Sequence, residues 1–236
     1  MMTVKEILAQ LEEYGDERTK NTLIRHGAKE PFFGVKVADL KKILKQTKKN
    51  HELSLELYKT GNSDAMYLAG LMADEKQITK EQLNDWVEKA YWSYLSEYAV
   101  PWVAAETKFG FELGLEWIKS KNEGVASAGW STLAYYSAVN QDEDLDIAMY
   151  KKLLDIVEND IHKSKNRVKY TMNGFVISVG TYINELTRKA SEIAEKIGKI
   201  EVNMNGTACK VPFAKDYIQK VIDKQRVGKK RKTARC

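Results

Sequence analysis

Four helical segments of similar composition recur along the chain, at offsets of about 30 to 43 residues. Each combines small side chains with aromatic or long apolar ones, and they cover residues 65–70, 98–103, 128–133 and 171–176. This period is typical of solenoids, in which each helix pair buries its apolar face only against its neighbours. With 3 Pro and 14 Gly in 236 residues, the chain lacks the turn residues of a multi-stranded β protein. We predict an all-α solenoid of helix pairs, with a plain helical bundle as the alternative.

Residues 200–211 break the helical pattern. Asn205-Gly206 is the strongest short signal for a two-residue type I′ turn, and apolar residues alternate on either side of it. The segment therefore predicts one C-terminal β-hairpin. We expect a single domain over 1–228 that includes this hairpin arm, followed by a basic, disordered tail over 229–236.

The formal net charge of +5 conceals a strong segregation of charge. Residues 36–49, 161–169 and 210–235 together carry +17, so the rest of the chain carries −12. Clustered basic residues beside an acidic remainder are typical of a surface that holds a polyanion. A solvated lysine face remains the alternative reading for 36–49 taken alone.

The window 161–169 is the most informative, because it opens a predicted helix. Cations at a helix N-terminus oppose the helix dipole, which suggests a use other than helix stability. Backbone N–H groups at the same position attract anions, so phosphate is the expected ligand. The predicted phosphate contacts are Lys163, Lys165, Arg167 and Lys169, with Lys36, Lys41 and Lys45 along the rim. The hairpin tip would enter a nucleic-acid groove through Asn203, Asn205, Gly206 and Lys210.

Aromatic residues are abundant, with 5 Trp and 12 Tyr. Such rings stack on nucleobases in some proteins and pack helices together in many more. Trp102 and Trp130 lie at equivalent places in two of the recurring segments, so they are the base-stacking candidates, together with Phe175.

Several other functions are not indicated. The two cysteines lie far apart and the three histidines are scattered, so we predict neither a metal nor a cofactor. No apolar run reaches about 18 residues, which favours a cytoplasmic protein without membrane contact, and we expect a monomer. No phosphate-binding loop or nucleophile elbow occurs. Glu97 and Glu106 are the candidate catalytic residues, with a solvated or salt-bridged role as the alternative.

Two stretches resemble a known family. Residues 31–43, PFFGVKVADLKKI, are similar to the N-terminal signature of the DNA alkylation repair (AlkD-like) family, and residues 167–177, RVKYTMNGFVI, resemble its late helix. The resemblance covers about residues 1–198. It implies a solenoid of HEAT-like repeats whose basic concave face holds duplex DNA. It also implies that active members remove N3- and N7-alkylated purines as monofunctional glycosylases without a metal or cofactor.

The sequence departs from the pattern of those active members. The resemblance places an Asp within 96–106 and an Arg within 126–131, but neither is present, and Phe175 stands where a Trp is expected. A glycosylase needs a carboxylate near the developing positive charge on the sugar. The hairpin resembles an insertion found in a branch of the family associated with branched DNA. We therefore predict a protein that binds duplex or branched DNA with little or no base excision. An alkylpurine glycosylase and a protein-binding scaffold are the alternatives.

Overall fold

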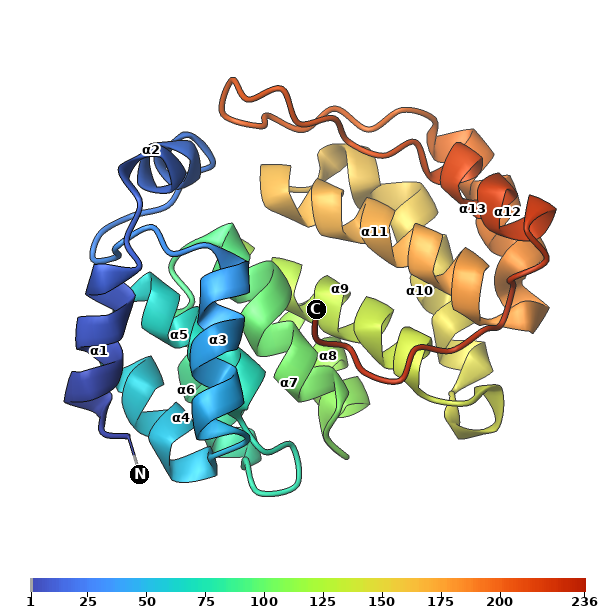
Figure 1. Ribbon diagram of the computed structural model, residues 1–236. Coiled ribbons are helices and arrows are strands. Elements are labelled where there is room, and N and C mark those ends of the chain that lie inside the picture. The colour runs from blue at the N-terminus through green and yellow to red at the C-terminus, as the bar shows by residue number, and fades with distance from the viewer. Residues whose placement is uncertain (1) are drawn as a thin grey trace.

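The computed structural model describes residues 2–236, which form a stack of helices that runs from left to right along the chain in Figure 1. The N-terminal end consists of three helices, α1 (Val4–Glu13), α2 (Glu17–Arg25) and α3 (Val37–Thr47). Five antiparallel pairs follow: α4 (His51–Lys59) with α5 (Ser63–Met72), α6 (Lys80–Lys89) with α7 (Val100–Ala105), α8 (Gly110–Trp117) with α9 (Glu123–Val139), α10 (Ile147–Asp160) with α11 (Asn166–Tyr182), and α12 (Thr187–Ile197) with α13 (Ala214–Asp223). Short 3₁₀ turns lie at η2 (Asp142–Asp144), η3 (Ile161–Lys163) and η4 (Asn184–Leu186).

The second helices of successive pairs form an inner layer. Helices α5, α7, α9 and α11 contact one another in that order, and α3 contacts α5. All four recurring segments of the sequence lie in this layer, so the predicted solenoid is confirmed. Small residues allow the helices to approach closely, since a Cβ on Gly129 would lie 2.5 Å from the backbone nitrogen of Ile118. The apolar core forms two clusters along the stack, and α9 contributes to both.

The inner layer contains one irregular turn, the π-helix η1 (Leu95–Ala99), which runs into α7. Pro101 follows it and has no N–H to donate to the carbonyl of Glu97, as an α-helix would require. Instead, the Val100 N–H donates a hydrogen bond to the Leu95 carbonyl, five residues earlier in the chain. Such π-turns recur at functional sites. Here the turn holds Glu97 in the interior, where it is 2% exposed.

The predicted β-hairpin at 200–211 is wrong in its strands and right in its turn. Asn205 and Gly206 both have positive φ, 54° and 69°, and the Thr207 nitrogen donates to the Met204 carbonyl at 3.1 Å. Among residues 2–236, however, no strand forms. We call this segment the 200–211 loop.

Side chains of helix α11 form hydrogen bonds with backbone groups that would have paired the two strands of a hairpin. Asn166 accepts a hydrogen bond from the Asn203 nitrogen at 2.7 Å and donates to the Asn203 carbonyl at 2.9 Å. Farther along, the Asn173 side chain donates to the Pro212 carbonyl at 2.8 Å. These side-chain contacts of α11 stand in place of strand pairing for the Asn203 and Pro212 backbone groups.

The last eight residues, expected to be disordered, lie instead against the inner layer. Figure 1 shows this tail (229–236) in red, running from α13 across α9 to a C-terminus near α7. The Lys230 ammonium donates to the Ser137 carbonyl at 2.9 Å. Arg235 is 8% exposed and pairs with Glu75 at 3.1 Å and with Glu106 at 3.3 Å. Acidic residues of the inner layer therefore give the basic tail a specific place.

Candidate nucleic-acid interface

The inner helices run in the same direction, so their N-terminal ends lie at one edge of the solenoid, which we call the basic edge. Lys36 precedes α3 there and Lys165 precedes α11, each at the N-cap position without a capping hydrogen bond from its side chain. Helix α2 and the 200–211 loop lie above this edge (Figure 1). The loop tip reaches the turn after α2, since a Cβ on Gly27 would lie 3.1 Å from the Asn205 side-chain nitrogen. The two segments thus form an arch.

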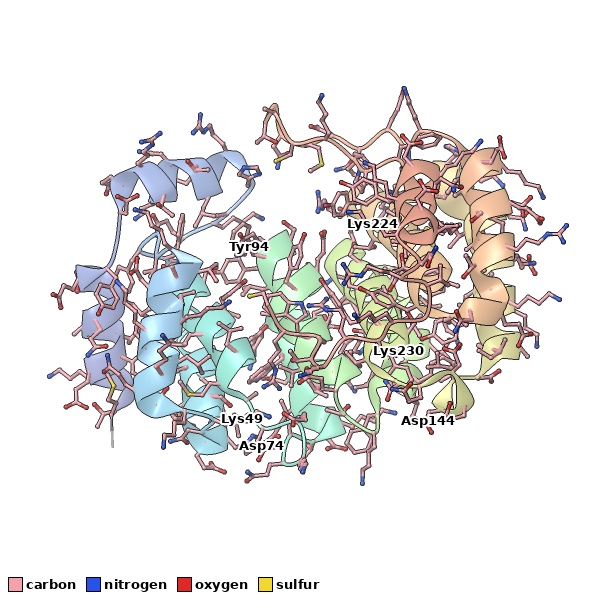
Figure 2. All side chains as sticks on the ribbon, turned by 45° about the vertical axis from the view of Figure 1, so that its right-hand side comes forward. Lys49, Asp74, Tyr94, Asp144, Lys224 and Lys230 are labelled. Carbon is pink, nitrogen blue, oxygen red and sulfur yellow. The ribbon has the colours of Figure 1, made fainter. Side chains whose placement is uncertain are left out.

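A cavity of about 460 Å³ opens beneath the arch. We call it the edge cavity. It combines positive charge with aromatic rings, and Figure 2 shows Tyr94 at its position beneath α2. Its lining includes Tyr94, Tyr98, Arg167, Tyr170, Asn205 and Lys210. The cavity therefore brings together cationic side chains, aromatic rings and side chains of the 200–211 loop.

Most of the predicted phosphate contacts gather at the basic edge. Lys163 is the most open, with its side chain 80% exposed, and Lys165 is exposed while its ammonium donates to the Lys121 carbonyl at 2.5 Å. Lys169 and Lys210 line a further hollow beneath the 200–211 loop, and the exposed Asn203, Asn205 and Gly206 form the loop tip.

The lysines of α3 are divided. Lys36 lies at the basic edge and comes within 3.8 Å of Asp16, the cap of α2. Lys41 and Lys45 lie farther along the helix, and at 1.5 Å per residue Lys45 is about 12 Å from the first residue of α3, Val37. These two are therefore separated from the arch, whereas Lys36 lies beside it.

Arg167 is the predicted phosphate contact that the structure uses differently. Its Nε and one terminal nitrogen donate to the two carboxylate oxygens of Glu97 at 2.6 Å and 2.5 Å. The guanidinium also lies over the Tyr170 ring, 4.4 Å from its centroid. Burial raises the pKa of the Glu97 carboxyl, and the Arg167 charge opposes that rise. Glu97, a candidate catalytic residue with a solvated or salt-bridged role as the alternative, therefore forms a buried ion pair in the structure.

The predicted base-stacking residues lie in the core of the protein. Trp102 and Trp130 are each 3% exposed and Phe175 is fully buried, so no base can reach their faces. Trp130 and Phe175 instead pack edge to face at 5.1 Å. These rings hold neighbouring helices together.

Half-buried tyrosines line the inner surface in their place. A second cavity, of about 400 Å³, runs between α9 and α11 and is bounded by α13 and the tail. Its rings are Tyr98, Tyr135, Tyr170, Tyr182 and Tyr217. We call it the tyrosine groove. Burial raises the pKa of Tyr98 and of Tyr135 above its ordinary value, so both hydroxyls stay protonated. The sequence signal that marks this groove is the spacing of Tyr170, Gly174 and Thr181 on one face of α11.

The other candidate carboxylate, Glu106, is engaged by the tail. It accepts hydrogen bonds from the Thr233 hydroxyl and, at 2.7 Å, from the Ala234 nitrogen, in addition to its ion pair with Arg235. Nothing in the residue pattern around Glu106 predicts this contact, because its partners lie about 127 residues away in sequence. Both carboxylates are therefore occupied within the chain.

Two further properties bear on function. Within the part of the chain that the structure describes, no three His, Cys, Asp or Glu side chains gather as a metal site would require. None of the helices in residues 2–236 is both long and apolar enough to cross a bilayer.

The stack of helix pairs with a curved inner layer defines an all-helical protein of the HEAT-like repeat class. The chain belongs to the DNA alkylation repair enzyme family, whose sequence model matches residues 7–198. A solved structure from a family described as related to the HEAT-like repeat DNA glycosylases, with affinity for branched DNA structures, matches over 100% of both chains. The TM-score is 0.91 and the sequence identity 38%.

Two curated relatives match over nearly their whole length. They are uncharacterised proteins of Listeria innocua and Listeria monocytogenes, and each is 32% identical over 226 residues. The match covers 93% of this chain and 97% of each relative.

Proposed function

We propose that this protein binds duplex and branched DNA at the basic edge, by contacts to phosphates and by shape. The observation that carries the proposal is the arch of α2 and the 200–211 loop over the edge cavity, with the lysines of α11 beside it. The solved relative with affinity for branched DNA supports the choice of ligand. Contacts to phosphates carry no sequence information, so the preference would be for the form of the DNA.

The arch suits a branch point better than a straight duplex. Lys36 lies near α2 on one side, and Lys163 and Lys169 lie near the start of α11 on the other. Two diverging duplex arms would meet these two groups of cations, while the tip at Asn205 and Gly206 would occupy the groove between the arms. Because α11 holds the loop through Asn166, the tip is presented in a fixed position.

The test compares a labelled four-way junction with a duplex of the same length, by fluorescence anisotropy at several salt concentrations. Lys163→Glu with Lys210→Glu should weaken junction binding and reduce the salt slope by about 1.8, since each phosphate contact contributes about 0.9. Lys151→Glu with Lys152→Glu on α10 is the matched control, since both side chains are exposed and lie away from the arch. Equal effects of the two pairs, or no junction binding at 50 mM salt, would refute the proposal.

We further propose that base excision is weak or absent. The two candidate carboxylates are held by Arg167 and by the tail, so neither is free to stabilise positive charge on a sugar. Incubation with alkylated DNA should release no 7-methylguanine or 3-methyladenine above the background rate. Release that disappears on Glu97→Gln would instead support the glycosylase alternative. The protein-binding scaffold would be favoured if neither DNA substrate binds.

A further inference from the structure

Three neighbouring cavities on the inner side of the solenoid share lining residues and so follow one another along a single path. The edge cavity and the tyrosine groove share Tyr98 and Tyr170, the ring over which the Arg167 guanidinium lies. At its other end the groove shares Tyr182 and Tyr217 with a third hollow of about 540 Å³, between α13 and the tail. We call this hollow the basic pocket. A ligand at the basic edge could therefore continue inward without leaving the protein surface.

The middle of the path offers ring faces and open space. Tyr170, Gly174 and Thr181 lie on one side of α11, and a Cβ on Gly174 would meet nothing within 4 Å. From Tyr170 to Tyr182 the helix rises about 18 Å. At about 3.4 Å of axial rise per nucleotide of a stacked strand, this length matches about five nucleotides.

The far end of the path carries unpaired positive charge. The basic pocket is lined by Lys220, Lys224, Arg226, Lys229, Lys230, Arg231 and Lys232. Among residues 2–236, only Lys230 of this set forms an ion pair, with Asp142 at 2.7 Å. Tyr217 is 49% exposed, and the Lys220 ammonium lies 5.1 Å from its ring centroid. Figure 2 shows Lys224 at the end of α13 and Lys230 in the tail below it.

We propose that this path is a binding site for single-stranded DNA, about five nucleotides long, in which bases contact the tyrosines and phosphates reach the basic pocket. Aromatic rings along a positively charged groove are the recognition pattern for single strands, since every unpaired base has a ring face to stack. A duplex has no free base faces, and a peptide without acidic residues would leave the cations of the basic pocket without partners. The inference rests on the proposed function in one respect, because a strand that diverges from a branch at the edge would enter this groove.

The experiment measures binding of labelled oligothymidylates of 3 to 12 nucleotides to the full chain by fluorescence anisotropy. Affinity should rise steeply up to about five nucleotides and then level off. Tyr217→Ala should weaken binding about fivefold to 150-fold, the range for loss of one stacked base. Lys220→Glu with Lys224→Glu should lower the salt slope by about 1.4, at about 0.7 per phosphate of a single strand.

These side chains are exposed on α13, so their replacement leaves the core intact. Lys151→Glu with Lys152→Glu on α10 should leave oligothymidylate binding unchanged. The proposal is overturned if no oligothymidylate binds at 50 mM salt, if the α13 and α10 variants bind alike, or if an acidic peptide of equal charge competes as well as the oligonucleotide.

The same variants separate this inference from the proposed function. Junction binding that persists in Tyr217→Ala while oligothymidylate binding is lost supports both. Oligothymidylate binding without junction binding refutes the proposed function alone. Junction binding in a protein that binds no oligothymidylate refutes the single-strand site alone.

Discussion

Replacement of Arg167 by Ala tests whether this residue serves the fold or holds phosphate. Glu97 is 2% exposed and receives both of its strong hydrogen bonds from Arg167. Removing the guanidinium leaves a buried carboxylate without a counter-charge, which typically costs about 3–5 kcal/mol. For a chain of this length the loss corresponds to a fall in Tm of about 6–20 °C.

The pH dependence has a definite sign. Burial already raises the pKa of Glu97 above its ordinary value of 4.5, and loss of Arg167 raises that pKa further. A carboxyl with a raised folded-state pKa favours the folded protein below its unfolded pKa, and that contribution is lost as pH rises through the folded value. The destabilisation of Arg167→Ala should therefore grow between pH 5 and pH 8.

Urea unfolding followed by circular dichroism at both pH values measures the effect. Arg167→Met with Glu97→Gln removes both charges at similar volume and should recover most of the loss. Lys163→Ala, in the neighbouring exposed turn, is the control and should change stability by less than about 0.5 kcal/mol. A cost below about 1 kcal/mol for Arg167→Ala, together with a large loss of DNA affinity, would refute the structural role and restore the phosphate contact.

Three further changes address the core, the loop and the tail. Trp130→Ala should lower the free energy of unfolding in urea by about 3–5 kcal/mol, because the ring is buried, and should leave the DNA affinity per folded molecule unchanged. A selective loss of DNA affinity would instead support Trp130 as a base-stacking residue. Asn166→Ala removes two hydrogen bonds to Asn203, so hydrogen exchange of the 200–211 loop should accelerate about fivefold to 30-fold, whereas unchanged exchange would contradict the pinning. Glu106→Gln removes the charge that pairs with Arg235, so trypsin should cleave the tail sooner by mass spectrometry, and equal rates in variant and wild type would show that the tail is held otherwise.

The helical layers could be predicted from the sequence because their signals are local. The recurrence of small and aromatic residues placed the inner helices correctly, including the segment that became α11. The same pattern predicted that Trp102 and Trp130 would lie on the inner surface, where tyrosines lie instead. Tyr135 follows Trp130 by five residues, which turns it by about 140° around α9, so one ring packs in the core while the other lines the groove.

The failures involve partners far away in sequence. The turn at Asn205 and Gly206 forms as predicted, because its conformation depends on those two residues alone. The flanking strands do not form, because Asn166 supplies hydrogen bonds from 37 residues away. The position of Arg235 likewise depends on Glu75, 160 residues earlier in the chain. Neither contact leaves a periodic signal in a single sequence.

The charge distribution links these outcomes. The acidic residues matter as much as the basic windows, because Glu75, Glu97 and Glu106, on or beside the inner helices, select where particular basic residues go. Each cation bound in this way is removed from the set that can contact phosphate. Among residues 2–236, Lys210 at the basic edge and Lys224 just after α13 form no ion pair, and they line the cavities at the two ends of the aromatic path. The ion pairs of these glutamates hold Arg167 and the tail beside the tyrosine groove. The cations without an acidic partner lie at the two ends of that groove, so in the proposed complex DNA would run from one end to the other.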